Sequence, residues 1–597
     1  MKNAPNLKHL PKEKFTEAII FAGADAFAHA RAWESGFGKA VAGDSTPPIY
    51  LGPKQLADLA NLRIVDKGRR SARVYLAGDI ESILINAIAG KLALAGVQDA
   101  KLYKGIPDRE PEDWRDYLIR LRQQSASGEE SIVENYIGVR QMHIDGDLSR
   151  MSPNRRGKVL AEYFGKIAIN QDSDVVYTYD GAVWVSVSLQ ELRRTLGAIY
   201  DENHTDYSVK GIDAAIDAMK IQIPVMGDER RDLIGFENGV YDLAEREFYP
   251  HSPDNWLLHH NGITFTPPAD DESPDIHAPH FTRWVTHAAG GDLGKIGRIK
   301  AALFMVLANR YDWQLFVEVT GEGGSGKSVF TSIAAILAGE NNTASGSMAA
   351  LDSARSRAQF VGKRLITLPD QVRYVGDGAG IKAITGGDLV EIDAKYEKPF
   401  STVIKAVVLA TNNEPMAFTE RKGGIARRRV ILPFNIPVKD EEKDPDLMKK
   451  IRGEIAVIIR HLLEIFSVPE HAKNMLLEQR DSSEALVVKQ NTDPLYGFCD
   501  HIVALGEAVG MLIGNLNITP RAPRVYLYHA YLAYMEAYGH ARPLTLTKFG
   551  TDFPAVLKEF GAEYKKARTR TGIRSNLNLS PSADDWLPAV PVTESLI

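Results

Sequence analysis

The chain has 597 residues, a length that predicts roughly three or four domains of ordinary size. Its hydrophobic fraction of 44% and charged fraction of 25% are those of ordinary globular protein, and its net charge of −6 excludes a protein that coats nucleic acid over its whole surface. Any contact with DNA would therefore come from local basic patches. Cys499 is the single cysteine, so an internal disulfide is excluded and a reducing, cytoplasmic compartment is expected.

Residues 1–128 are expected to form an N-terminal α/β domain, because short apolar runs alternate with helical stretches there. The start, residues 1–14, is polar and rich in lysine and proline, and it lacks the apolar core of a signal peptide. The longest apolar stretch, residues 83–97, is interrupted by Lys91 and is too short to span a bilayer. We therefore expect no secretion and no membrane partner.

Two acidic residues of this first domain are similar to the metal-binding acids of topoisomerase–primase domains. Asp79 and Glu81 follow the apolar run 74–77, and in such domains two carboxylates hold Mg²⁺ for nucleotidyl transfer. Those domains also have a glutamate after an earlier strand, whereas here the run 19–21 leads into Ala-Gly. We therefore expect a degenerate domain that does not prime, in which the two acids belong to the start of a helix.

Residues 129–275 are expected to form a second accessory domain. Residues 175–185 place strand-like runs on both sides of an Asp-Gly pair, a pattern that predicts a hairpin with a tight turn. An amphipathic helix is predicted over 189–199. A stretch rich in Pro, Asp, Ser and His, residues 267–279, marks the boundary with the next domain.

The third domain, residues 276–489, contains the most specific motif of the chain. The apolar run 315–320 leads into Gly-Glu-Gly-Gly-Ser-Gly-Lys-Ser at 321–328, and a helix is predicted over 329–337. Strand, glycine-rich loop and helix in this order predict a phosphate cradle, and ATP and Mg²⁺ are the expected cofactors. Lys327 would reach the β- and γ-phosphates, and the Ser328 hydroxyl would hold the metal. The residues expected to bind the nucleotide are Gly321, Gly323, Gly324, Ser325, Gly326, Lys327, Ser328 and Val329.

Polar residues at the ends of further predicted strands complete the expected catalytic set. Asp370 follows an apolar strand and is placed to hold Mg²⁺ and the attacking water. Asn412 ends the next strand and would touch the γ-phosphate or orient that water. Three arginines, residues 427–429, precede a last strand, and one would stabilise the phosphate transferred in a neighbouring subunit. Each residue also has a structural alternative. Asp370 could belong to a surface turn, Asn412 could be an asparagine favoured by a turn, and the arginines could form a solvated surface patch.

Residues 315–434 resemble the core of superfamily 3 helicases, in particular the viral, satellite-phage and plasmid primase–helicase family. The matching motifs are residues 321–328, Asp370, residues 381–388 with Lys395 and Tyr396, residues 410–412 with Pro415, and the arginine cluster that runs into Phe434. The resemblance implies an AAA+-like fold and a ring, expected to be a hexamer. Such a ring binds ATP between subunits and moves 3′ to 5′ along single-stranded DNA.

The same resemblance implies roles for single residues. Lys382 and Lys395 lie in a segment similar to the channel hairpin, where lysines grip successive phosphates without reading sequence. The chain departs from the family at Gln371, where the family often has a second acid. Either Asp370 both binds the metal and acts as the catalytic base, or another carboxylate supplies the base. The remaining implied roles are phosphate and Mg²⁺ binding by Lys327 and Ser328, metal and water binding by Asp370, γ-phosphate sensing by Asn412, and an arginine finger at Arg427 or Arg428.

The last domain, residues 490–597, is predicted to contain helices over 525–538 and 548–560 and a hairpin over 564–579. Thr547 is placed to cap the second helix. The hairpin has no acidic residue, and the residues expected to bind DNA are Lys565, Lys566, Arg568 and Arg570, with Arg574 beside them. This order resembles a winged-helix domain, in which a helix reads base edges and the wing holds phosphate. The alternative is a solvated basic hairpin.

Residues 236–243, with 250–253, resemble the accessory domain named after the poxvirus helicase–primase. The expected fold is therefore α/β, with an AAA+-like P-loop ATPase core, N-terminal α/β accessory domains and a C-terminal winged helix. The expected enzyme is an ATP hydrolase and DNA helicase that starts replication of a prophage, satellite phage or plasmid, in the cytoplasm of a bacterial host or a virus-infected cell. Its expected partners are single-stranded and forked DNA, further copies of itself and host replication proteins.

Three alternatives stay open. A bifunctional primase–helicase would also need priming by the first domain. An origin-binding initiator would use ATP only to assemble and would not separate strands. An AAA+ protein remodeller would present an aromatic and apolar channel loop in place of Lys395.

Overall fold

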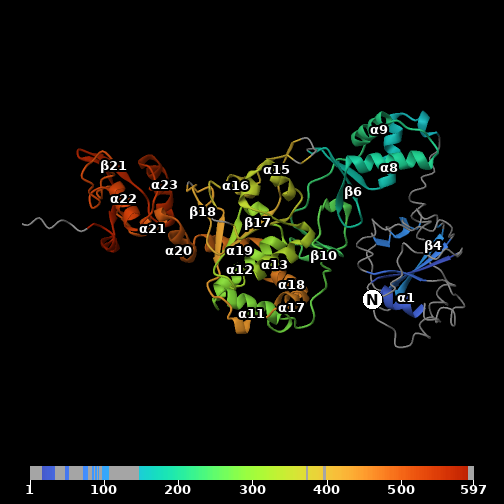
Figure 1. Ribbon diagram of the computed structural model, residues 1–597, viewed down its shortest axis with the longest axis horizontal. Helices are drawn as coiled ribbons and strands as arrows, with labels where there is room; N and C mark the ends of the chain where they lie inside the picture. Colours follow the sequence, from blue (N-terminus) through green and yellow to red (C-terminus); the bar gives the residue numbers. More distant parts are fainter. Residues whose placement is uncertain are drawn as a thin grey trace, which may run out of the picture. The chain divides into compact units, whose positions relative to one another are not determined.

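The computed structural model describes residues 147–588 apart from 172, 372–373, 394, 396–398 and 422, and, of the first 146 residues, 17–23, 25–33, 48–52, 71–77, 84–85, 88–90, 92, 97 and 99–106. The chain divides into two compact units, Met1–Gly165 with Leu189–Ile223, and Lys166–Ser188 with Pro224–Ile597. Both units contain helices and strands, and the fold is mixed α/β with parallel sheets (Figure 1).

Among the described residues of the first unit, four parallel strands form a sheet in the order β2-β1-β3-β4. Both faces of the sheet are buried, since Ile20 and Val74 enter one apolar cluster while Phe21 and Tyr75 enter another. Alternation of side chains along each strand makes this possible, and burial of both faces is typical of parallel sheets. The strands are β1 Glu17–Gly23, β2 Pro48–Leu51, β3 Ser71–Ala77 and β4 Asp99–Ile106.

The α-helices described in the first unit are α1 Ala26–Ala32, α7 Pro153–Phe164, α8 Leu189–Glu202 and α9 Val209–Gln222. Helix α8 confirms the predicted amphipathic helix and extends it by one turn. Helices α7 and α9 pack closely at Gly157, where an added Cβ would lie 2.7 Å from the Ala215 carbonyl oxygen. The predictions for Asp79 and Glu81 lie outside the described residues.

Two small antiparallel sheets, β5-β6-β7 and β10-β9-β8, open the second unit. The predicted hairpin is confirmed as β6 and β7. Its turn is held by Asp180, whose Oδ1 accepts hydrogen bonds from the N–H groups of Ala182 and Val183, both at 2.8 Å. The strands are β5 Ile167–Asn170, β6 Val175–Tyr179, β7 Trp184–Val187, β8 Leu233–Phe236, β9 Gly239–Asp242 and β10 Glu247–Tyr249.

Five parallel strands form the central sheet of the second unit, in the order β12-β13-β17-β11-β19. Four of them confirm the strands expected from apolar runs, and β12 is a fifth that the pattern does not indicate. Val317 packs into the core on one face and Phe316 into the core on the other, so both faces are buried. The strands are β11 Phe316–Thr320, β12 Thr343–Ser345, β13 Leu365–Pro369, β17 Val407–Asn412 and β19 Arg429–Pro433.

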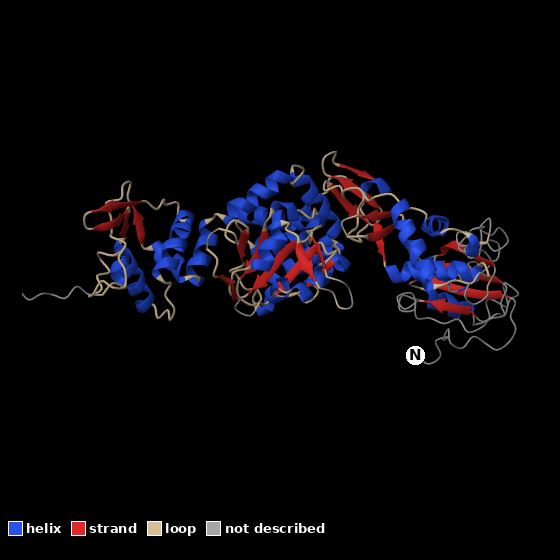
Figure 2. Cartoon of the chain, turned by 90° about the horizontal axis from the view of Figure 1, so that it is seen from above, coloured by secondary structure: helices blue, strands red, loops and turns tan. Residues whose placement is uncertain are grey.

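Helices surround this sheet (Figure 2). The core on the Val317 face includes α11 Pro279–Ala288, α12 Leu293–Leu307, α13 Lys327–Ala338, α17 Leu447–Gly453, α18 Ile455–Ile465 and α19 Pro469–Arg480. The core on the Phe316 face includes α14 Met348–Asp352 and α16 Ala379–Gly386. Because the strands are parallel, the carboxyl ends of β11, β13 and β17 meet at one edge, which is where open α/β sheets bind ligands.

Smaller elements complete this part of the chain. The helices are α10 Pro274–His277 and α15 Ala354–Arg357. Strand β14 Val375–Gly376 pairs in parallel with β18 Ala417–Phe418. Strands β15 Val390–Ile392 and β16 Phe400–Thr402 form an antiparallel hairpin.

The C-terminal segment contains the helices α20 Ser483–Thr492, α21 Pro494–Asp500, α22 Leu527–Ala537 and α23 Leu546–Glu559. Its antiparallel strand pairs are β20 Ile502–Ala504 with β23 Leu577–Leu579, and β21 Lys566–Thr569 with β22 Gly572–Ser575. The predicted cap Thr547 is wrong. Helix α23 begins two residues earlier, so the Oγ1 of Thr545 accepts the Lys548 N–H at 3.3 Å. Across the described part of the chain, the helices are too short or too polar to cross a membrane.

Candidate active site

The glycine-rich loop between β11 and α13 turns the chain sharply at the carboxyl edge of the sheet. Gly321 has φ +142° and Gly326 has φ +93°, backbone conformations that residues with a Cβ rarely adopt. At Gly321 a Cβ would also collide with the Phe434 carbonyl oxygen. Gly326 is the N-cap of α13, so the glycines allow the N-terminus of this helix to begin directly after the loop.

Lys327 is held inside the loop by backbone oxygens. Its Nζ donates to the carbonyl oxygens of Gly321 at 2.6 Å and Glu322 at 2.7 Å. Burial lowers the pKa of Lys327 below its usual range, while the Asp370 carboxylate opposes this shift. The ammonium group is therefore positioned by carbonyl dipoles, which are weaker partners than a phosphate group.

A cavity of about 1000 Å³ opens beside the loop. Six of the eight residues expected to bind the nucleotide line it, namely Gly323, Gly324, Gly326, Lys327, Ser328 and Val329. The other two do not line it: Ser325 is 1% exposed, and Gly321 packs against the Phe434 carbonyl. The rest of the wall comes from α11 and from residues between Val438 and Leu447.

Asp370 reaches the same cavity from the end of β13. It has φ +40°, in the left-handed region that aspartate tolerates better than most residues, and its N–H donates to the Thr411 carbonyl oxygen at 2.8 Å. The neighbouring Gln371 is occupied. Its Oε1 accepts the Met348 N–H at 2.9 Å, and its Nε2 donates to the Pro369 carbonyl oxygen at 2.9 Å. Gln371 therefore fixes the end of β13 and does not supply a second acid.

Asn412 lies at the end of β17 and is 1% exposed. Its Oδ1 accepts the Gln371 N–H at 2.9 Å, and its Nδ2 donates to Glu318 Oε1 at 3.1 Å. The next residue, Asn413, is exposed and lines the cavity. Asn413 was not predicted as a site residue, although two adjacent asparagines follow this apolar run in the sequence.

A second missed pair lies under the site. Glu318 is 0% exposed, and its Oε2 accepts a hydrogen bond from Arg429 Nε at 2.6 Å. Arg429 Nη2 also donates to the Met416 carbonyl oxygen at 2.9 Å. The sequence feature that could have indicated this pair is Glu318, a single carboxylate in an otherwise apolar strand. The third arginine of the cluster is thus a buried structural cation.

The other two arginines do not line the cavity beside the glycine-rich loop. Arg427 is exposed, whereas Arg428 is 8% exposed and donates from Nη1 to the Gly424 carbonyl oxygen at 2.8 Å. Burial and the neighbouring Arg427 lower the pKa of Arg428 below its usual range. Action on the nucleotide of another subunit stays a prediction.

A second cavity, of about 680 Å³, adjoins the first. Asp370 and Asn413 line both cavities and so stand between them. Glu414 lines only the second cavity; it is exposed and, among the described residues, has no hydrogen bond or ion pair. The carboxylates of Asp370 and Glu414 therefore both line the second cavity.

The two lysines expected in the DNA channel lie on different elements. Lys382 is on α16, with its Nζ 3.8 Å from Asp377 Oδ2. Lys395 lies between β15 and β16, a hairpin in the segment where the resemblance implies one. Several of its neighbours are outside the described residues. The DNA contacts of both lysines stay predictions.

The basic residues of the C-terminal hairpin are accessible. Lys565, Lys566, Arg568 and Arg570 are all exposed. Lys565 has a partner in Glu563, at 3.3 Å, and Arg574 donates to the Gly510 carbonyl oxygen at 3.0 Å. The strands β21 and β22 contain no acidic residue, so this surface is positively charged along its length.

Three segments match family models. Residues 157–289 match a family described as D5 N terminal like, residues 490–588 match Poxvirus D5 protein-like, and residues 319–429 match a family of unknown function (DUF5906). The phage P4 origin-binding domain is 47% identical in sequence; the match covers 16% of this chain and 98% of that chain, with a TM-score of 0.16. The A form apo structure of the NrS-1 C terminal region is 12% identical over 72% of this chain and 99% of that chain, with a TM-score of 0.41.

The two D5 matches lie on both sides of the segment that contains the candidate site. The chain belongs to the poxvirus D5-like primase–helicase family, as the sequence motifs predict. It is a family of DNA-replication proteins.

Proposed function

We propose that the chain is an ATP-dependent, ring-forming DNA helicase that acts at replication initiation of a prophage, satellite phage or plasmid. One observation carries the proposal: Lys327, Ser328 and Asp370 line a single cavity at the carboxyl edge of a parallel sheet. Strand β17 lies between the loop strand β11 and the acid-bearing β13, so its asparagines stand between lysine and aspartate. This arrangement supports the AAA+-like P-loop core that the sequence resemblance implies.

The residues present fit ATP and Mg²⁺. The cavity is at the upper end of the usual size for small-molecule sites, which is about 300–1,000 Å³. The N-terminus of α13 and the loop N–H groups favour phosphate, and Lys327 would exchange two carbonyl partners for phosphate oxygens. Mg²⁺ typically binds through one or two protein oxygens together with phosphate oxygens, and Ser328 and Asp370 supply such oxygens. The bound ion would neutralise charge on the phosphates.

We assign the activation of the attacking water to Glu414 together with Asp370. Gln371 cannot do this work, because an amide is not a base at neutral pH and its side chain is already hydrogen-bonded. Glu414 is the other carboxylate that lines the second cavity together with Asp370. Asn413 lines the cavity and would be available to contact a bound nucleotide, whereas Asn412 would first have to leave Gln371 or Glu318.

In the proposed ring, Arg427 or Arg428 acts on the ATP of the neighbouring subunit. Neither lines the cavity of its own chain, which is compatible with action in trans. Lys382 and Lys395 would hold the backbone of one DNA strand as it passes through the ring. The proposed C-terminal winged helix consists of α22, α23 and the basic hairpin, in that order. The 47% identity to the phage P4 origin-binding domain, over 16% of this chain, supports origin binding by part of the chain.

A forked-duplex unwinding assay tests the proposal. Wild type should separate the strands only with ATP, and Lys327→Ala, Arg428→Ala and Lys395→Ala should not. Lys395→Ala should keep its basal ATP turnover, because Lys395 lies outside the nucleotide cavity. Lys473→Ala is a matched control, since this lysine on α19 pairs with Glu470 and lies away from both cavities.

Unwinding by Lys327→Ala at the wild-type rate would contradict the proposal. Wild type that binds DNA and ATP but separates no strands would instead identify an origin-binding initiator.

A further inference from the structure

The arginine-bearing segment, residues 419–428, joins β18 to β19 and contains both candidate fingers. Contacts within the segment define its shape. Glu420 Oε2 accepts the Ile425 N–H at 3.0 Å, and Arg428 donates to the Gly424 carbonyl oxygen. Ile425 is 3% exposed and packs in the core on the Phe316 face of the sheet. A displacement of this segment would therefore also displace Arg427 and Arg428.

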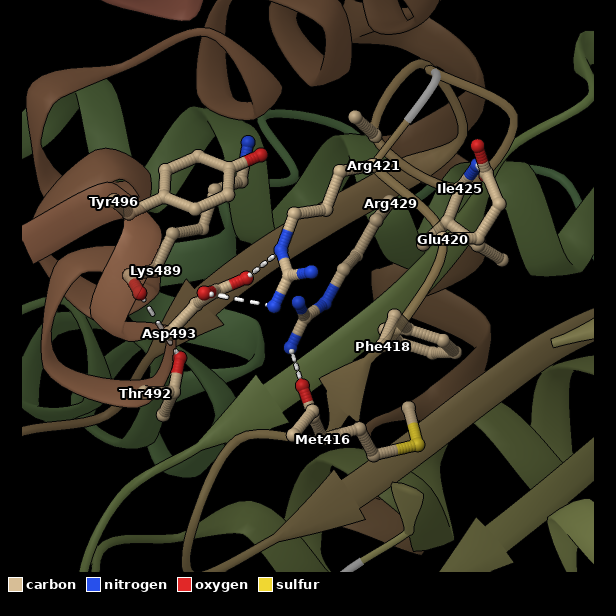
Figure 3. A pocket seen from close by; sticks show the side chains of 12 residues that line it. Met416, Phe418, Glu420, Arg421, Ile425, Arg429, Lys489, Thr492, Asp493 and Tyr496 are labelled. Atoms are coloured by element: carbon tan, nitrogen blue, oxygen red, sulfur yellow. Dashed lines mark hydrogen bonds and ion pairs between the residues drawn. The ribbon is translucent and has the colours of Figure 1, made fainter. Parts of the chain in front are cut away.

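One side chain of the segment reaches out to the C-terminal helices. Arg421 Nε donates to Asp493 Oδ2 at 2.5 Å, and its Nη2 donates to Asp493 Oδ1 at 3.0 Å (Figure 3). Its Nη1 donates to Asp552 Oδ2 at 3.3 Å. The side chains of Arg421 and Asp493 are each 14% exposed, and that of Asp552 is 0% exposed. Bidentate, charge-assisted bonds of this kind fix direction as well as distance.

The two aspartates belong to α21 and α23, whose shared apolar core also contains Tyr564 and Leu577, before β21 and after β22. Asp493 is the N-cap of α21, where its Oδ1 accepts the Leu495 N–H at 3.0 Å. Asp552 lies inside α23, 2.9 Å from Lys548 Nζ. Only a short connection separates α23 from β21. A shift of the hairpin that moves α23 would therefore act on Arg421.

There is little room for Arg421 to move on its own. The cavity around it measures about 30 Å³ and is also lined by Arg429, Lys489 and Tyr496 (Figure 3). Lys489 and Tyr496 both bind Glu559 of α23, each at 2.6 Å. Close packing transmits displacement, so the segment and the C-terminal helices should move together or lose these bonds.

We propose that Arg421 is a positioning residue that couples DNA binding by the C-terminal hairpin to the placement of Arg427 and Arg428. The inference rests on the proposed function, because it concerns the regulation of the same ATP site. Such coupling is reciprocal for binding: if DNA changes the affinity for nucleotide, nucleotide changes the affinity for DNA by the same factor. Coupling between sites typically amounts to roughly 5- to 150-fold.

The experiment measures forked-duplex affinity with and without a non-hydrolysable ATP analogue, and ATP turnover with and without the duplex. Arg421→Met removes the charge but keeps most of the side-chain length. Asp493→Asn keeps an oxygen that can cap α21, so it protects the fold while it weakens the pair. Arg460→Met is the matched control. Arg460, on α18, forms a bidentate pair with Glu272, which precedes α10, at 2.7 and 2.5 Å, with side chains 12% and 11% exposed.

Wild type and Arg460→Met should show the same nucleotide-dependent change in DNA affinity, of roughly fivefold or more. Arg421→Met and Asp493→Asn should bind the analogue normally but lose most of that change, together with the stimulation of turnover by DNA. A wild-type response in Arg421→Met, or an equal loss in Arg460→Met, overturns the inference. If wild type itself shows no ATP turnover, the proposed function fails, and the coupling fails with it.

Discussion

Glu414→Gln is the sharpest test of the assigned chemistry, because it replaces a carboxylate by an amide of the same shape. Glu414 lines the second cavity but not the nucleotide cavity, so the change should leave nucleotide affinity intact. It should instead lower the rate of hydrolysis. Asp370 stands between the two cavities and should keep holding the metal in the variant.

A positioned general base contributes about 10²- to 10⁴-fold to a rate. We expect the lower end of this range, about 100-fold or roughly 2.7 kcal/mol in the activation barrier, for two structural reasons. Glu414 is exposed, so water already solvates its charge. Asp370 lines the same cavity and can partly replace Glu414 as the base in the variant.

Steady-state ATP turnover and equilibrium binding of a fluorescent nucleotide measure the two effects separately. Glu478→Gln is the control, an exposed glutamate on α19 that lines neither cavity. A turnover within about threefold of wild type in Glu414→Gln would refute the assignment of a general base. A parallel loss of nucleotide affinity would refute the separation of the two cavities.

Three further predictions concern charge. Glu318→Gln leaves the buried Arg429 without its counter-ion and should lower the free energy of unfolding by about 3–5 kcal/mol, measured as a lower denaturation midpoint. Adding Arg429→Met should recover much of this loss if the ion pair is the cause. Arg568→Ala should weaken DNA binding on every sequence and reduce the salt slope by about one; a loss confined to one sequence would mean base readout. Burial and the nearby ammonium of a lysine lower the pKa of His461 to about 4 in the folded chain. Neutral His461 therefore contributes to the free energy of unfolding above about pH 6.5, and this contribution is lost as the pH falls towards 4. His461→Gln should flatten the dependence of the free energy of unfolding on pH between these values.

Local patterns predicted much of the segment around the candidate site. Apolar runs of five to eight residues marked the strands β11, β13, β17 and β19, and the glycine-rich loop marked the start of α13. These features depend on residues close in the chain, since strand alternation and glycine conformations are local properties. The hairpin at Asp180 was predictable for the same reason.

Side-chain orientation was not predictable in this way. Asn412 and Asn413 are adjacent in the sequence, yet one is buried against Glu318 and the other faces the cavity. Which of the two points outward depends on where β17 ends, relative to β11 and β13. That register is a property of the assembled sheet.

The sequence by itself determined the family, the order of strand, loop and helix around the candidate ATP site, and the acidic and basic residues available to it. Only the tertiary structure decided how the charges pair. Arg421 meets Asp493 across 72 positions and Asp552 across 131, and Glu318 meets Arg429 across 111. Such pairs form because folding excludes water from several elements at once, and a buried charge then requires whichever partner the packing brings near.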